Sequence, residues 1–191
     1  MPAFPFRAAL LTALAFASPV VAFAGGLDDA VLAELNYARA HPDDYARELR
    51  QQLRASGDDD PDAVEEAIAF LEHQPALPPL ARDSRIAAAA HTYAAAQGLR
   101  GDLGHGPAGG LGQRLRDNGV WAGLSAEDIS YGYDEPRAVV RQMIVDSGVP
   151  GRGHRRNIFS GSYSVAGVAC GPHRTYRAMC VIDFAGAIVQ R

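Results

Sequence analysis

The most restrictive feature of this sequence is a change in the spacing of its apolar residues. From Leu27 onward, apolar residues recur at three- and four-residue intervals, as at Val31, Leu35 and Ala38, which is the spacing of one helix face. Over the last thirty residues, apolar and polar positions alternate instead, as they do in β-strands. Helices first and strands last indicate a protein of the α+β class.

Start signals divide the helical part of the chain into separate segments. Pro42 interrupts the first apolar stripe and predicts either a break or the start of a second helix. Asp60 is predicted to cap a helix that begins at Pro61, and Glu135-Pro136 opens a later one. The alanine-rich segment 83–99 predicts a closely packed helix between them.

The first 24 residues have the composition of a secretory signal peptide. One basic residue, Arg7, precedes a short apolar run that ends in Ala22-Phe23-Ala24. A membrane anchor is the alternative, but Ser18-Pro19 interrupts the run, which is shorter than the roughly 20 apolar residues that a bilayer requires. We therefore predict cleavage after residue 24 and a single mature domain over 25–191. This domain is expected to be secreted or periplasmic, with no stable membrane insertion.

The charge of the mature segment narrows the classes of partner. Without Arg7 it contains 17 arginines, no lysine and 22 acidic residues, which gives a net charge of −5. Nucleic-acid-binding domains usually display a concentrated basic surface, so no nucleic-acid partner is predicted. The lack of lysine excludes Schiff-base chemistry and a catalytic lysine.

The two cysteines of the chain, Cys170 and Cys180, lie in neighbouring predicted strands on either side of the turn-like segment 171–174. An even number of cysteines in an exported chain favours a disulfide bond between them. A reduced buried pair or a redox couple is the alternative, although the CxxC spacing of redox pairs is absent.

Two histidines preceded by glycine, His105 and His154, are the candidate functional residues. Neutral imidazole suits zinc or copper, and a carboxylate can complete or orient such a site. Glu127 and Asp146 are considered with the histidines because each also lies at the edge of a predicted element. Spacing alone does not show that the four residues meet. An alternative for His154 is that it merely caps a following short helix.

Five segments together resemble the CAP superfamily, which comprises cysteine-rich secretory proteins, antigen 5, plant pathogenesis-related proteins and many bacterial extracellular proteins. Their order and spacing are far more specific than any single segment, and they extend through most of the mature chain. The segments are LNYAR at 35–39, LARDSRI at 80–86, GHGPAGG at 104–110, AEDISYG at 126–132 and RGHRRNI at 152–158.

The resemblance implies a three-layer α-β-α sandwich, in which a central, mainly antiparallel sheet lies between helical layers beside an open cleft. Residues 50–79 are longer than the family core requires and are predicted to form an added helical segment.

The resemblance also implies a cleft site of two histidines and two acids, which holds zinc in some members. By motif, His105, Glu127 and His154 correspond directly to family positions. Asp146 is the candidate for the second acid, although Ile144 stands where the family has tryptophan. Asp128 replaces the family's usual asparagine.

The predicted function is binding of an extracellular small-molecule, lipid, peptide or glycan ligand in this cleft, with zinc as a candidate cofactor at His105 and His154. One alternative is a zinc-assisted, peptidase-like hydrolase in which Glu127 acts as the general base. Another is that the four side chains serve only the fold. No serine or cysteine has an identifiable base, so nucleophilic catalysis is not predicted.

Overall fold

The structure of the protein is a computed structural model that describes residues 26–55, 60–107 and 109–189. The predicted signal peptide, residues 1–24, lies outside the described residues. The described residues form seven helices and four strands in the following order: α1 (Leu27–Ala40), α2 (Pro42–Ala55), α3 (Pro61–Leu71), β1 (Ala81–Arg82), α4 (Ser84–Arg100), α5 (Gly110–Asp117), β2 (Ser125–Tyr131), α6 (Pro136–Val145), α7 (Gly153–Ile158), β3 (Val165–His173) and β4 (Arg177–Ala185).

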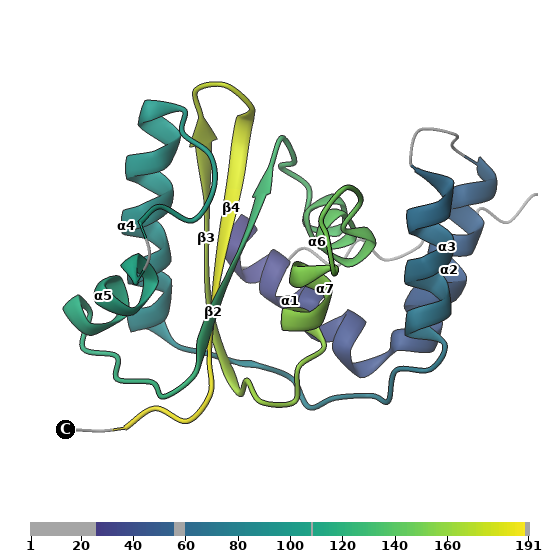
Figure 1. Cartoon of the computed structure of the whole chain (residues 1–191), viewed down its shortest axis with the longest axis horizontal. Helices are drawn as coiled ribbons and strands as arrows, with labels where there is room; N and C mark the ends of the chain where they lie inside the picture. The colour runs from purple at the N-terminus through teal and green to yellow at the C-terminus, as the bar shows by residue number, and fades with distance from the viewer. Residues whose placement is uncertain (1–25, 56–59, 108, 190–191) are drawn as a thin grey trace, which may run out of the picture.

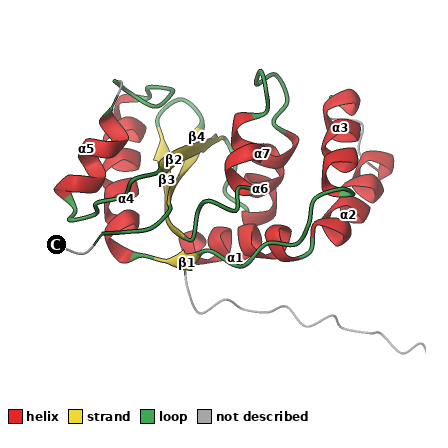
Figure 2. Cartoon of the chain, turned by 60° about the horizontal axis from the view of Figure 1, so that its bottom comes forward, coloured by secondary structure: helices red, strands yellow, loops and turns green. Residues whose placement is uncertain are grey.

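The four strands form one sheet between layers of helices. The strand order is β1-β3-β4-β2, and only the short β1–β3 pair is parallel. Helices α4 and α5 cover one face, and α1, α6 and α7 lie on the other, with α2 and α3 beyond them (Figures 1 and 2). The predicted α-β-α sandwich with a mainly antiparallel sheet is therefore confirmed.

The helices begin where the local sequence signals predict. The Asp60 side chain caps α3 by accepting a hydrogen bond from the backbone N–H of Ala63, and proline follows the cap. The Glu135 side chain caps α6 in the same way, through Ala138 N at 2.8 Å. Pro42 is the first residue of a second helix, α2. Proline is tolerated there because a residue at the first helical position makes no intrahelical hydrogen bond through its backbone nitrogen.

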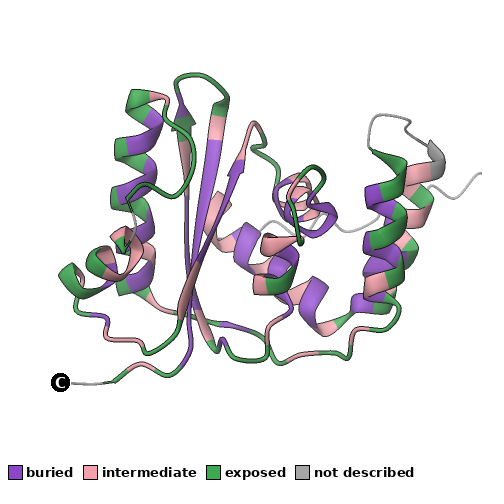
Figure 3. Ribbon diagram, in the orientation of Figure 1, coloured by how far each residue is buried: buried purple, intermediate pink, exposed green. Residues whose placement is uncertain are grey.

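Three apolar clusters hold the layers together: a large one on the α1 and α6 face of the sheet, and two smaller ones on the α4 and α5 face (Figure 3). Leu35, Val140 and Ile182 lie in the larger core, between the sheet and α1 and α6. On the other face, the alanine-rich α4 packs so closely on β3 that a Cβ atom at Gly167 would overlap the backbone of Ala87. Small residues on α4 and a glycine on β3 are therefore both needed for this contact.

The hairpin of β3 and β4 carries the predicted disulfide bond. Cys170 and Cys180 are directly opposite each other on the two strands and are bonded to each other. The prediction of a structural disulfide is confirmed, and the alternative of a reduced pair is not.

The segment 50–79 contains the end of α2, all of α3 and an extended connection. Helix α3 packs against α2 and α6 on the side remote from the sheet (Figure 2). The connection is fixed by the buried Arg39, whose Nε donates to the carbonyl of Pro78 at 3.2 Å. Within the described residues, no helix combines the length and apolar character needed to cross a bilayer.

Candidate functional site

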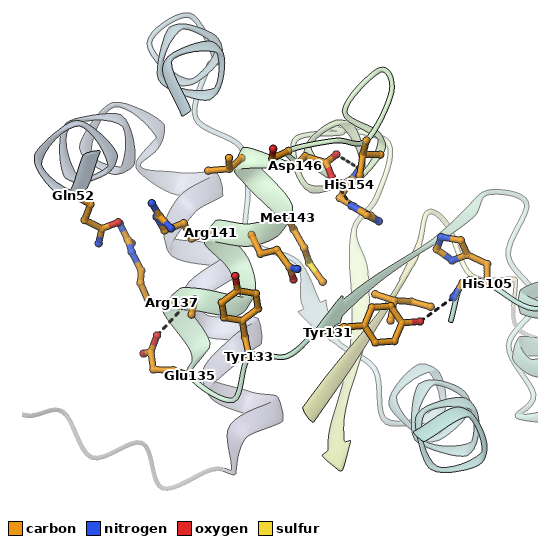
Figure 4. Close-up of a pocket in the computed structure, with 17 residues that line it drawn as sticks. Gln52, His105, Tyr131, Tyr133, Glu135, Arg137, Arg141, Met143, Asp146 and His154 are labelled. Atoms are coloured by element: carbon orange, nitrogen blue, oxygen red, sulfur yellow. Dashed lines mark hydrogen bonds and ion pairs between the residues drawn. The ribbon is translucent and has the colours of Figure 1, made fainter. Parts of the chain in front are cut away.

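A cavity of about 680 Å³ lies between β2 and α6, and both predicted histidines line it (Figure 4). His105 comes from the loop after α4, whereas His154 is the second residue of α7. Their rings lie at the same end of the cavity, and Gln52, Arg137 and Arg141 line the other end (Figure 4). The fold thus brings together two histidines that are 49 residues apart in the sequence.

The loop that carries His105 turns sharply on both sides of the histidine. Gly104 and Gly106 have φ values of +84° and +71°, which fall in the left-handed region. Residues with a Cβ atom rarely adopt this region, so the flanking glycines are required by the backbone rather than by the ligand.

A buried polar network fixes this loop to the neighbouring elements. Tyr93 on α4 donates its hydroxyl hydrogen to the carbonyl of Gly104 at 2.8 Å, and Gln97 donates to the same carbonyl at 2.6 Å. The Gly104 N–H in turn donates to the hydroxyl of Tyr131 on β2 at 3.0 Å. Both hydrogen-bonding groups of the glycine are therefore satisfied, which holds the next residue, His105, in position.

Glu127 orients the ring of His105 from a position outside the cavity lining. Its Oε1 lies 3.0 Å from His105 Nδ1, and its Oε2 accepts a hydrogen bond from Arg114. A carboxylate in an ion pair only accepts hydrogen bonds, so Nδ1 carries the proton and Nε2 of a neutral ring is left as an acceptor or metal ligand. The Glu127 side chain is only 3% exposed and does not line the cavity, whereas that of His105 is 55% exposed.

Asp146 holds His154 through two hydrogen bonds. Its Oδ1 lies 2.7 Å from His154 Nδ1, and its Oδ2 accepts the His154 backbone N–H at 3.0 Å. This hydrogen bond to the ring raises the pKa of His154 above its usual value. The residue that caps α7 is Arg152, so the role of His154 is not that of a helix cap.

Two further acids are buried next to this site. Asp128 follows Glu127 on β2 and therefore points to the opposite face of the sheet, where its Oδ1 accepts a hydrogen bond from Asn157 at 2.7 Å. Burial raises the pKa of Asp128 to about 7. Asp183 lies opposite Glu127 on β4, and burial together with that carboxylate raises its pKa well above the usual range. Among the described residues, neither side-chain oxygen of the buried Asp183 has a hydrogen-bond partner, which favours its neutral form.

The loop between α6 and α7 is fixed by Arg155, which is 3% exposed. Its guanidinium donates to the carbonyls of Ile144 and Val145 at 2.6 and 2.9 Å, and to Glu66 of α3 at 3.0 Å. A cation at the last carbonyls of α6 also complements the helix dipole. Arg155 is thus a buried ion-pair partner, whereas the next residue, Arg156, is exposed.

Sequence reasoning did not identify several residues on which the site depends: Glu66, Tyr93, Gln97, Arg114, Tyr131 and Asp183. Their contacts join segments that are far apart in the chain, and no local motif marks them. Arg114 is separated from Glu127 by 13 residues, and Glu66 from Arg155 by 89. A single sequence contains no signal for such pairs.

The donor set of the site does not meet the requirements of the predicted zinc ion. Among the described residues, no group of three or more histidine, cysteine, aspartate or glutamate side chains could hold a metal ion. A catalytic zinc site normally uses three protein ligands. The residues therefore do not fit such a site, although carboxylate bonds to Nδ1 are typical of histidines that bind metal through Nε2.

The sequence model of the cysteine-rich secretory protein family, CAP, matches residues 32–184. No curated protein matches the chain. Among solved structures, the chain is similar to an extracellular protein containing an SCP domain from Bacillus anthracis strain Ames. The identity is 24%, over 63% of this chain and 37% of that chain, with a TM-score of 0.49.

Two further solved structures are similar. An outer surface protein from Borrelia burgdorferi is 19% identical over 58% of this chain and 79% of that chain, with a TM-score of 0.47. A cysteine-rich secretory protein from Staphylococcus aureus is 15% identical over 88% of this chain and 41% of that chain, with a TM-score of 0.47. The match spans less than half the length of the Bacillus and Staphylococcus proteins.

Proposed function

The chain belongs to the cysteine-rich secretory protein (CAP) family, and from this premise we propose that it is an exported protein whose cleft binds an extracellular ligand between His105 and His154. Export is supported by the signal-like segment 1–24 and by the disulfide bond, because disulfides persist in oxidising compartments. N-terminal sequencing of the exported protein should find Gly25 as the first residue.

One observation carries the proposal: the two histidines line the same cavity, and each is bonded at Nδ1 to a carboxylate that is almost completely buried. Such a bond fixes the orientation of the ring and leaves Nε2 for a ligand. Two histidines that served only the fold would be expected to have both ring nitrogens satisfied by protein groups, as His173 has.

The geometry gives less support to a zinc-assisted hydrolase with Glu127 as general base. A general base must come within hydrogen-bonding reach of the proton that it removes. Glu127 is outside the cavity lining, and both of its carboxylate oxygens are already bonded, to His105 and to Arg114. We therefore assign Glu127 the role of orienting His105.

The proposal is tested by NMR of the histidine rings in the purified mature protein. Zinc, capped peptides, soluble glycans and fatty acids are added separately, and the ring signals of His105, His154 and His173 are followed. A ligand of the cleft should shift His105 and His154 together and leave His173 unchanged. Probes that shift only one of the two rings, or neither, would show that the histidines do not share a binding site.

The purely structural alternative makes a different prediction for His154→Ala. If the four side chains only stabilise the fold, this variant should melt at a clearly lower temperature than the native protein. Our proposal predicts that binding to the cleft is lost with a smaller change in stability. Isothermal calorimetry with a probe that shifts the rings, together with thermal unfolding, separates the two.

A further inference from the structure

We propose that the ligand of the cleft is an extended peptide, which adds as a further strand to the outer edge of β2 at Ile129 and Tyr131. This inference rests on the proposed function, since it takes the same cleft to be the binding site. It goes further by assigning the chemical class of the ligand and the backbone groups that recognise it.

The register of the sheet determines which backbone groups of β2 face outward. β2 is the last strand in the sheet and pairs only with β4. Gly132 N–H donates to the carbonyl of Ala178 at 2.8 Å, and Gly186 N–H donates to that of Leu124 at 3.0 Å. In an antiparallel pair, hydrogen-bonded positions alternate with positions whose N–H and C=O point away. The backbone groups of the even-numbered residues of β2 therefore bond to β4. The backbone N–H and C=O groups of the odd-numbered residues point away from β4, toward the open edge of the sheet.

Two of these outward-facing residues, Ile129 and Tyr131, line the cavity. In the part of the chain that the structure describes, no protein group forms a hydrogen bond to their outward N–H and C=O groups. An open row of backbone donors and acceptors is a template for another strand, which is why exposed strand edges are usually protected. Here the row is left open inside a cavity, next to the two histidines.

The walls of the cavity lie on either side of this edge. The loop of His105 lies on the α4 side of the sheet, since His105 is bonded to Glu127, whereas Met143 and His154 come from α6 and α7 on the other side (Figure 4). Successive side chains of an added strand point to opposite faces. A bound peptide would therefore present one side chain toward His105 and the next toward Met143 and His154.

The dimensions of the cavity favour a single peptide strand over the edge of a second folded copy. The cavity has a volume of about 680 Å³ and lies between walls formed by α6 and by the loop of His105. A second copy would have to bring the helices that flank its own β2 into the same space. A free strand needs only the usual separation of about 4.8 Å from β2. Backbone recognition of this kind is a known mode of peptide binding.

Hydrogen exchange provides the test, with neighbouring residues of β2 as internal controls. A library of acetylated and amidated hexapeptides, randomised at every position, is selected on the immobilised mature protein. In the free protein, we expect the amides of Ile129 and Tyr131 to exchange much faster than those of Asp128 and Ser130, which are paired with β4. A selected peptide should slow exchange at Ile129 and Tyr131 and leave the other two unchanged.

Peptide chemistry adds a second readout. N-methylation of alternate residues on the face that pairs with β2 should weaken binding roughly tenfold or more, since each lost hydrogen bond lowers the affinity. N-methylation of the other set should have little effect. Ala138→Trp, which places a bulky side chain in the lining of the cavity, should abolish binding, whereas Ala88→Trp at an exposed position of α4 should not.

The outcomes separate this inference from the proposed function. Peptides that shift the rings of His105 and His154 without protecting Ile129 and Tyr131 would overturn strand addition and leave the cleft as the binding site. If no peptide is selected, the peptide assignment is wrong. If selected peptides affect neither ring and still bind Ala138→Trp, both proposals fail. Protection of the two amides in the free protein that increases with protein concentration would identify a second copy as the occupant instead.

Discussion

At the level of single residues, the two histidines of the cleft are held by similar devices in different surroundings. Both bond through Nδ1 to a nearly buried carboxylate, but the His105 side chain is 55% exposed and that of His154 is 21% exposed. Glu127 is also neutralised by Arg114, so its negative charge is shared between two partners. Asp146 binds both the ring and the backbone N–H of His154 and thus acts on that histidine alone through its side chain.

We predict that Asp146→Asn lowers the pKa of His154 toward the ordinary histidine value, because the raised pKa depends first on the hydrogen bond that the ring donates to the Asp146 carboxylate. Asparagine has nearly the same shape and tolerates the left-handed backbone of this position, where φ is 54°. NMR titration of the His154 ring measures the change. The exposed Asp102→Asn is the control and should leave this titration unchanged.

The same pair makes stability depend on pH. The folded state raises the pKa of His154, so the extra stability is fully present below the unfolded pKa of about 6.5 and is lost as the pH rises through the folded value. Asp146→Asn should therefore cost about 1–2 kcal/mol at pH 5 and less at pH 9. Urea unfolding at the two pH values measures this difference. An equal loss at both would show that the charge of His154 is not involved.

At the level of elements, a disulfide bond and the close packing of α4 both constrain the hairpin of β3 and β4. The disulfide bond joins β3 to β4 across a separation of 10 residues, and α4 lies directly against β3. Gly98 of α4 is as restricted as Gly167 of β3, because a Cβ atom there would overlap the carbonyl oxygen of Pro172. The disulfide bond fixes the hairpin on the face of the larger core, whereas the close contacts of α4 fix the opposite face, which supports Glu127 and His105.

Removal of the disulfide with the Cys170→Ala/Cys180→Ala double variant should destabilise the protein by about 3 kcal/mol, the chain-entropy value for so short a loop. The effect on the cleft should be small, since Cys180 belongs to the larger apolar core and neither cysteine lines the cavity. Urea unfolding gives the free energy. The double variant should still show simultaneous shifts of the His105 and His154 ring signals in NMR when a ligand probe is added. Loss of these shifts would show that the cleft depends on the disulfide bond.

Gly167→Ala should destabilise the fold by roughly 2–3 kcal/mol, because α4 must move away to make room for the new methyl group. Gly171→Ala on the same strand is the matched control, since open space surrounds its Cβ position. It should change stability by no more than about 0.5 kcal/mol. Thermal unfolding of both variants is sufficient, and equal effects would show that the α4–β3 contact is less close than described.

At the level of the whole molecule, α3 connects the outermost helical layer to the cleft. Glu66 on α3 accepts hydrogen bonds from Arg152 at 2.8 Å and from Arg155 at 3.0 Å, and these arginines flank His154. Asp60 at the start of α3 accepts another from Ser147 at 3.0 Å. The segment predicted as an addition to the family core thus helps to hold one wall of the cavity.

We predict that Glu66→Gln loosens the loop over 146–152 and lowers stability by about 1 kcal/mol, because two cations lose their carboxylate. Arg152 lowers the pKa of Glu66, so this contribution is present above the ordinary glutamate pKa and disappears as the pH falls through the folded value. Amide hydrogen exchange in the loop measures the loosening. The neighbouring Glu65→Gln, on an exposed position, is the control and should exchange like the native protein.

Much of the fold could be predicted from residues that are close together in the chain. Asp60 before Pro61, and Glu135 before Pro136, start helices because a cap and the backbone that it satisfies lie within three residues of each other. Cys170 and Cys180 pair because a tight turn places adjacent strands side by side. Local geometry alone decides such features, so the sequence by itself determines them.

The cavity and the orientation of its side chains were decided only by tertiary structure. His105 and His154 line one cavity because β2 lies between the loop after α4 and the start of α7, and that placement depends on the packing of the apolar clusters on both faces of the sheet. The Glu127 carboxylate bonds to the His105 ring instead of lining the cavity. Its surroundings include Arg114 and Asp183, which come from other elements. Contacts between distant segments form only when the layers close. No local pattern of residues therefore determines which polar groups are paired and which are left open to a ligand.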